Sequence, residues 1–164
     1  MIRQATLADI NTIRELALAT WPVAYAKILS PAQLHYMLQL IYSPEALSLQ
    51  MQQKNHRFIL LYNNDLPVGF ASYSRKENDE ILKFHLQKLY VLPGEQGKGS
   101  GQQLLDYVIR QAQSAGAVQM ELNVNRQNPA LHFYKKNGFN IHHEEDIDIG
   151  EGYFMNDYVM SKHI

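Results

Sequence analysis

The 164-residue chain contains no cysteine. The sequence therefore excludes disulfide bonds, thiolate zinc sites and a cysteine nucleophile. It also lacks an excess of either charge, because 15 Lys and Arg stand against 16 Asp and Glu, a formal net charge of −1. Binding to nucleic acid without sequence preference needs a strongly basic surface, and the overall charge provides none. We expect no nucleic-acid partner.

Long apolar runs are also missing. No stretch approaches the roughly 18 apolar residues that a membrane-spanning helix needs. Residues 1–6 lack the charged and apolar regions of a signal peptide. We therefore expect a cytoplasmic protein without membrane contact. Apolar residues make up 46% of the chain, enough for a sizeable core. No linker, repeat or low-complexity tract divides the sequence, so we expect one domain over residues 1–164.

The N-terminal third reads as a short strand over 2–6 followed by helices. Thr6-Leu7-Ala8-Asp9 has the pattern of a capping box, and apolar residues then recur at helical spacing. Ser30-Pro31 and Ser43-Pro44 each combine an N-cap residue with proline at the first helical position, which predicts two further helices. We place the segment from Trp21 to Tyr25 between the first two helices.

The remainder alternates strands with helices. Strands are predicted at 56–62, 68–73, 81–92, 118–124, 139–147 and 153–160. One helix follows the glycine-rich segment after Pro93 and ends at Gly116, and a short one opens at Asn128-Pro129. The apolar positions change parity between Leu86 and Leu89, which favours a β-bulge. The order of elements indicates a mixed α/β layer structure.

The segment from Gly94 to Gly101 holds four glycines and one lysine between a predicted strand and a predicted helix. Converging backbone N–H groups and the helix dipole make such a turn an anion site suited to phosphate. A P-loop would need lysine where Ser100 stands. A dinucleotide fingerprint would need glycine where Gln102 or Leu104 stands. Both of these phosphate-binding classes are therefore excluded.

Two segments resemble the GNAT acetyltransferases. Gln96-Gly97-Lys98-Gly99-Ser100-Gly101 is similar to motif A of that family, Gln/Arg-x-x-Gly-x-Gly/Ala, and the stretch 128–139 is similar to its Asn…Ala…Tyr-x-x-x-Gly-Phe segment. The resemblance implies a single domain with a central, mostly antiparallel twisted sheet. That sheet would splay between its fourth and fifth strands and carry helices on both faces.

The resemblance also implies an activity. The protein would transfer an acetyl group from acetyl-CoA to a primary amine by direct attack in a ternary complex, without a metal. The acceptor would be a small molecule, a polyamine-like cation, or a peptide or protein amine. An alternative stays open, a non-catalytic acyl-CoA-binding sensor or regulatory module, because the stretch 85–88 lacks the carboxylate that many family members carry there.

Similarity assigns the binding residues for acetyl-CoA. The backbone of Leu89, Tyr90 and Val91 would bind the pantetheine arm as an added strand. Backbone amides would hold the pyrophosphate, and they belong to Gln96, Gly97, Lys98, Gly99, Ser100 and Gly101. This chain departs from the family spacing before the tyrosine, so Asn125 and Asn128 are both candidates for a further contact with the cofactor.

Tyr134 matches the family tyrosine near the thioester sulfur. A phenol, with an ordinary pKa of about 10, can protonate the departing thiolate, although core packing is the alternative reading. The backbone N–H of Tyr90 is the candidate donor to the oxyanion. The base stays open: His85 could act directly, and Glu80 or Asp146 through a water molecule.

The acceptor pocket is assigned to Trp21, Tyr25 and His85, with a core position as the equal alternative for Trp21. His142-His143 is a poor metal site on the argument that adjacent strand residues point to opposite faces. The exposed final strands offer a surface for a homodimer.

Overall fold

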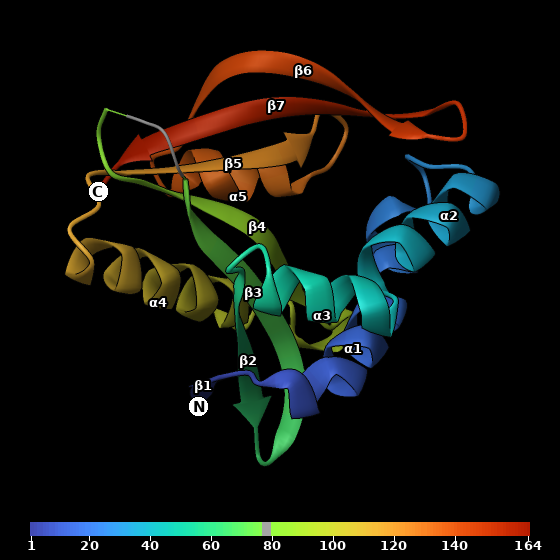
Figure 1. The fold of residues 1–164 in the computed structure, drawn as a ribbon, viewed down its shortest axis with the longest axis horizontal. Coiled ribbons are helices and arrows are strands. Elements are labelled where there is room, and N and C mark those ends of the chain that lie inside the picture. Colours follow the sequence, from blue (N-terminus) through green and yellow to red (C-terminus); the bar gives the residue numbers. More distant parts are fainter. Residues whose placement is uncertain (77–79) are drawn as a thin grey trace.

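The computed structural model describes residues 1–76 and 80–164. Within these residues, one seven-stranded sheet runs in the order β1-β2-β3-β4-β5-β7-β6 (Figure 1). Neighbouring strands are antiparallel except β4 and β5, which are parallel. The predicted mixed α/β fold with a mostly antiparallel sheet is confirmed.

The strands are β1 (Ile2–Gln4), β2 (Arg57–Asn63), β3 (Leu66–Lys76), β4 (Lys83–Val91), β5 (Gln119–Asn125), β6 (Asn140–Gly150) and β7 (Tyr153–His163). The helices are α1 (Ile10–Tyr25), α2 (Pro31–Tyr42), α3 (Pro44–Gln52), α4 (Ser100–Ser114) and α5 (Ala130–Lys136), with short 3-10 turns at Leu7–Asp9 and Pro93–Glu95. None of these helices is long and apolar enough to cross a membrane.

The predicted helix starts are confirmed. Thr6 and Asp9 form the reciprocal capping box. Ser30 and Ser43 each accept a hydrogen bond from the amide three residues on, at 3.1 and 3.2 Å. These side chains satisfy amides that would otherwise lack an acceptor in the first turn. α2 and α3 begin directly after their N-caps, whereas Thr6 caps the 3-10 turn Leu7–Asp9 that leads into α1 at Ile10.

The placement of Trp21 to Tyr25 between two helices is wrong. α1 continues through Pro22 to Tyr25. An internal proline weakens a helix because it removes one hydrogen bond and crowds the preceding turn. Here Trp21 and Tyr25 are buried on the same face as Leu16 and Ala17, and this packing keeps the segment helical.

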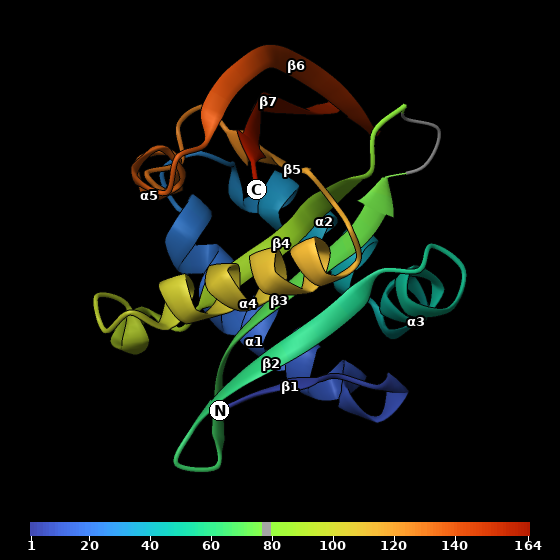
Figure 2. The ribbon, with the colours of Figure 1, turned by 90° about the vertical axis from the view of Figure 1, so that its left-hand side faces the viewer.

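Helices cover both faces of the sheet (Figure 2). α4 packs on one face, where its buried Leu104, Leu105 and Val108 meet residues of β3 and β4. α1, α2 and α3 pack on the other face over β2 and β3. The sheet is therefore packed between two apolar layers, one under α4 and one under α1, α2 and α3. The cavity described below is lined by residues of both α1 and α4.

The β-bulge predicted on the third long strand is confirmed. Ser72 of β3 is opposite Lys88, but the next residue, Tyr73, is opposite Leu86. Gln87 is therefore the extra residue of β4. The bulge returns apolar side chains to the α4 face at Leu89, which explains the change of parity in the sequence.

The predicted splay between the fourth and fifth strands is also confirmed. The β4–β5 ladder begins at Lys83–Gln119 and ends at Leu86–Leu122. Both strands continue beyond this point, β4 paired with β3 and β5 paired with β7. The two strands thus separate within one sheet, directly after the bulge.

A second bulge corrects the reading of His142 and His143. The register shifts between Ile141 and His143, so that His142 is an extra residue in β6. The Nδ1 atoms of the two histidines lie 2.6 Å apart, rather than on opposite faces. Among the described residues, no group of three or more His, Cys, Asp or Glu is arranged to hold a metal ion.

Candidate active site

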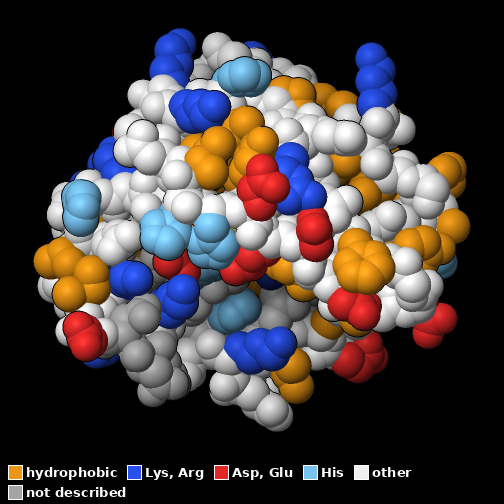
Figure 3. Space-filling view, turned by 90° about the horizontal axis from the view of Figure 1, so that it is seen from above, with side chains coloured by type: hydrophobic (Ala, Val, Ile, Leu, Met, Phe, Trp, Pro, Cys, Tyr) orange, Lys and Arg blue, Asp and Glu red, His pale blue; other side chains and the backbone are white. Residues whose placement is uncertain are grey.

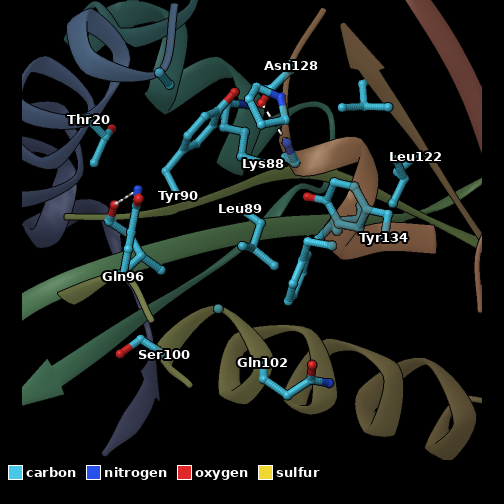
Figure 4. Close-up of a pocket in the computed structure, with 18 of the residues that line it drawn as sticks. Thr20, Lys88, Leu89, Tyr90, Gln96, Ser100, Gln102, Leu122, Asn128 and Tyr134 are labelled. Carbon is cyan, nitrogen blue, oxygen red and sulfur yellow. Dashed lines mark hydrogen bonds between the residues drawn. The ribbon is translucent and has the colours of Figure 1, made fainter. Parts of the chain in front are cut away.

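A cavity of about 770 Å³ opens where β4 and β5 separate. Its lining comes from α1, β4, the glycine-rich turn, the start of α4, β5 and α5 (Figure 4). The predicted site residues in this lining are Tyr25, Leu89, Tyr90, Val91, Gln96, Gly97, Gly99, Ser100, Gly101, Asn128 and Tyr134. Its volume suits a ligand of drug size or larger.

The glycine-rich turn forms one end of the cavity. Gly97 and Gly99 have φ angles of +80° and +81°, in the left-handed region that favours glycine. Gly99 is the N-cap of α4, so the amides of Ser100, Gly101 and Gln102 have no acceptor within the helix. These amides and the helix dipole can bind an anion.

Lys98 belongs to the predicted phosphate-binding segment, but it is not among the residues that line the cavity. Its side chain is 60% exposed and lies 3.5 Å from the carboxylate of Glu95. The backbone of the turn, rather than this ammonium group, therefore faces the anion site.

The β4 edge forms the wall of the cavity. Leu89, Tyr90 and Val91 pair with β3 on one side. On the other side, the ladder to β5 has already ended at Leu86. A strand edge of this kind can bind an extended ligand through main-chain hydrogen bonds.

Tyr134 extends from α5 toward β4 at the middle of the cavity (Figure 4). It is 7% exposed and packs edge-on against Phe133 and Phe139, with ring centroids 5.3 and 5.8 Å away. Burial raises the pKa of the Tyr134 hydroxyl above its ordinary value. The hydroxyl therefore keeps its proton at neutral pH and can donate it.

Tyr25 and Trp21 are both predicted to line the acceptor pocket, but only Tyr25 belongs to the cavity lining. The hydroxyl of Tyr25 is 2.9 Å from that of Tyr90, at the wall of the cavity. Trp21 is 3% exposed, donates its Nε1 hydrogen to Tyr42 at 3.0 Å, and is not part of the lining. Trp21 is a core residue that supports Tyr25 from behind, at 4.7 Å between ring centroids.

Asn125 and Asn128 both stabilise the turn between β5 and α5. Asn125 Oδ1 accepts the amide hydrogen of Gln127, and Asn128 Oδ1 accepts that of Ala130, each at 2.9 Å. Only Asn128 also belongs to the cavity lining. The structure therefore favours Asn128 over Asn125 as the residue near a bound ligand.

The three candidate bases lie outside the cavity lining. His85 Nδ1 is 3.4 Å from Glu121 Oε1, and Lys76 ion-pairs with the same oxygen. The His85 hydrogen bond, with help from Lys76, lowers the pKa of Glu121 to about 2. Asp146 ion-pairs with Arg126, and Glu80 is exposed.

Two buried charged residues near the cavity were not predicted. Lys88 lines the cavity, is 8% exposed and donates to Gln50 Oε1 at 2.7 Å. Burial lowers the pKa of Lys88 to about 7. Asp157 is 6% exposed on β7. A charged residue within an apolar strand was the only sequence signal for either one.

Comparison with known proteins defines the class. The fold is that of an acyltransferase. The model of the acetyltransferase (GNAT) domain family matches residues 26–154, and the chain belongs to this family.

Similar proteins match along nearly the whole chain. An uncharacterized N-acetyltransferase of Mycobacterium tuberculosis is 26% identical, covering 96% of this chain and 99% of the relative. The spermidine N(1)-acetyltransferase of Thermoplasma acidophilum is 29% identical, covering 98% and 95%. A crystal structure of the PaiA N-acetyltransferase from Thermoplasma acidophilum in complex with coenzyme A has a TM-score of 0.81 and 28% identity, covering 100% of this chain and 98% of that one.

Proposed function

We propose that residues 1–164 form one N-acetyltransferase domain that transfers an acetyl group from acetyl-CoA to a primary amine. The observation that carries this proposal is the end of the β4–β5 ladder at Leu86–Leu122. The separation opens a cavity that runs from the glycine-rich turn to Tyr134 and Tyr25. A similar protein has been solved in complex with coenzyme A, which supports the choice of ligand.

The residues of the cavity fit acetyl-CoA. The unpaired edge at Leu89, Tyr90 and Val91 suits the pantetheine amides, and the amides of the turn from Gln96 to Gly101 suit the pyrophosphate. An alanine Cβ at Gly97 or Gly99 would meet nothing within 4 Å, so the turn leaves open space for a ligand. When bound, acetyl-CoA supplies the activated acetyl group.

Two residues of the chain are assigned to the chemistry. The backbone N–H of Tyr90 would donate to the carbonyl oxygen of the acetyl group, whose negative charge grows during the attack. Tyr134 would deliver its proton to the sulfur as the thiolate leaves. A buried phenol that stays protonated at neutral pH suits this second role.

The acceptor would enter from the side of Tyr25. The structure carries exposed acidic side chains over β6 and β7 at this end of the sheet (Figure 3). They are Glu144, Glu145, Asp146 and Asp148 of β6. Arg126 ion-pairs with Glu144 and Asp146, so one positive charge stands among these four negative ones. A negative surface raises the local concentration of cationic amines. One similar protein is a spermidine N(1)-acetyltransferase, and this relative makes spermidine the first acceptor to test.

A thermal shift assay and an acceptor panel test the proposal. Acetyl-CoA and CoA should both raise the melting temperature, and ATP and NAD should not. Acetylation of spermidine, putrescine or a lysine-containing peptide should then release CoA thiol. Stabilisation by acetyl-CoA without turnover of any amine would contradict the enzyme hypothesis and support the alternative, a non-catalytic acyl-CoA-binding module. Stabilisation by ATP or NAD alone would overturn both readings.

A further inference from the structure

Asp157 occupies a central position on the inner face of β7. It is opposite Asn125 on β5 and Glu145 on β6. Only 6% of the residue is exposed. Asn123 Nδ2 lies 3.4 Å from Asp157 Oδ2 and donates to it. Within residues 1–76 and 80–164, the buried Oδ1 atom of Asp157 has no hydrogen-bond partner.

Asp157 is not itself part of the cavity lining, but it contacts that lining at the acceptor end. Asn123, its hydrogen-bond donor, lines the cavity, and so does Tyr25. Burial raises the pKa of Tyr25, and the negative charge of Asp157 raises it further. Tyr25 in turn hydrogen-bonds with Tyr90, whose backbone N–H is assigned to the oxyanion. Asp157 is therefore near the chemistry and away from the phosphate-binding turn.

The surroundings of Asp157 do not stabilise its charge well. Burying a carboxylate oxygen without a donor costs about 1–3 kcal/mol of folding free energy. Glu145 adds a like charge, and Arg126 only partly offsets it. Burial is the main reason that the pKa of Asp157 is raised above the ordinary aspartate value. A carboxylate held this way accepts a proton more readily than an exposed one.

Other charged groups near β4 have partners. His85 contacts the Glu121 carboxylate, and Lys88 donates to Gln50 between the rings of Tyr42 and Phe58. A base must direct a free lone pair toward the acceptor. Among these groups, the Asp157 carboxylate has an oxygen, Oδ1, that accepts no hydrogen bond from the described residues.

We propose that Asp157 is the general base that takes a proton from the acceptor ammonium group. This inference rests on the proposed acetyl transfer. Asp157 Oδ1 accepts one ammonium proton and leaves a lone pair on nitrogen. That pair forms the C–N bond while the C–S pair moves to sulfur, which takes the proton of Tyr134. The second nitrogen proton returns to Tyr134 through solvent, and Asp157 releases its own proton to solvent.

The test compares Asp157→Asn with Glu145→Gln, which removes the neighbouring acid on β6. With spermidine as the first acceptor at pH 7, Asp157→Asn should lower kcat about 10²- to 10³-fold, within the range for loss of a general base. Glu145→Gln should retain kcat within a factor of about three. The Glu145 carboxylate accepts from the same Asn123 Nδ2 at 3.5 Å, but it is exposed, contacts His143 at 2.9 Å and does not line the cavity. Thermal shifts by CoA should be equal in all three proteins.

The pH profile separates a base from a structural residue. Above the pKa of Asp157 the wild-type rate should be level, and below it the rate should fall as the carboxylate is protonated. Tyr25, Glu145 and Arg126 are the other titratable groups that surround it. The Asp157→Asn rate should instead rise about tenfold per pH unit toward the acceptor pKa of roughly 10, because only pre-deprotonated amine reacts.

Stability provides a readout that is independent of activity. Asp157→Asn removes a buried charge, so its melting temperature should equal or exceed that of the wild type. Equal kcat at pH 7, or a loss that stays constant with pH and accompanies a lower melting temperature, would overturn the base role while the proposed transferase function stands. Failure of the wild-type protein to acetylate any amine would overturn both.

Discussion

The hydroxyl groups of Tyr25 on α1 and Tyr90 on β4 lie 2.9 Å apart, although the two residues are 65 positions apart in sequence. This hydrogen bond joins the end of α1 to the strand edge that borders the cavity. Tyr90 also packs against Trp21 and Phe70, at 5.6 and 5.7 Å between ring centroids. The aromatic cluster therefore holds the end of α1 against the sheet beside the cavity.

The tyrosine pair predicts a coupled effect on stability. Tyr25→Phe and Tyr90→Phe should each lower the free energy of unfolding by about 1 kcal/mol, because each leaves a buried hydroxyl without one partner. The double variant should lose less than the sum, since neither hydroxyl is then left behind. Urea unfolding of the four proteins measures this cycle. Strict additivity would show that the two hydroxyls contribute independently.

Replacing Tyr134 by Phe should lower kcat by about 10²-fold, with little change in the KM for acetyl-CoA, because the phenol acts on the leaving sulfur. Since burial raises the pKa of Tyr134, its ionisation should cause no loss of rate below about pH 10. Steady-state kinetics between pH 7 and pH 10 measure both effects. Tyr107→Phe on α4 is a suitable control, because Tyr107 does not line the cavity. Full activity of Tyr134→Phe would show that this ring serves packing alone.

Gly94, at the start of the turn, and Gly99, the N-cap of α4, differ in backbone angle. Gly99 has a φ of +81°, whereas Gly94 is not among the glycines with positive φ, and an added Cβ at either meets nothing within 4 Å. Gly99→Ala should therefore lower stability by about 1–2 kcal/mol through backbone strain. It should also weaken CoA binding, measured by calorimetry, because the helix N-terminus shifts. Gly94→Ala should leave both quantities unchanged, and equal effects of the two substitutions would contradict this account.

Asp9 connects the capping box to β1. Its carboxylate accepts the Thr6 amide at 2.8 Å and ion-pairs with Arg3 at 2.8 Å, and the Arg3 hydrogen bond chiefly lowers the pKa of Asp9 to about 2. The unfolded value is near 4, so this stabilisation is present above about pH 4 and disappears as the pH falls toward 2.

Asp9→Asn should therefore reduce the free energy of unfolding at pH 7 by about 1 kcal/mol, the usual effect of a lost cap. The difference from the wild type should shrink at pH 2. Urea unfolding at the two pH values provides the measurement. The kcat should not change, because Asp9 is remote from the cavity lining. If the difference in free energy of unfolding were the same at both pH values, the Arg3–Asp9 ion pair would not contribute to stability.

Local signals predicted much of the fold because they act within a few residues. The caps at Ser30 and Ser43 fixed the starts of α2 and α3, and Thr6 caps the 3-10 turn that leads into α1. The parity change before Leu89 located the bulge in β4. The same reasoning misplaced the end of α1, where packing of Tyr25 outweighs the proline at position 22. It also misread His142, because a bulge in β6 depends on pairing with β7.

By itself, the sequence determined the order of elements, the glycine-rich turn before α4, and the pattern that relates the chain to its family. These features depend on backbone angles and hydrogen bonds between residues near in sequence. Only the tertiary structure decided that Trp21 belongs to the core, that Tyr25 meets Tyr90, and that Asp157 of the last strand adjoins the cavity. Those relationships arise from strand pairing and helix packing between distant segments, where no local pattern marks the partner.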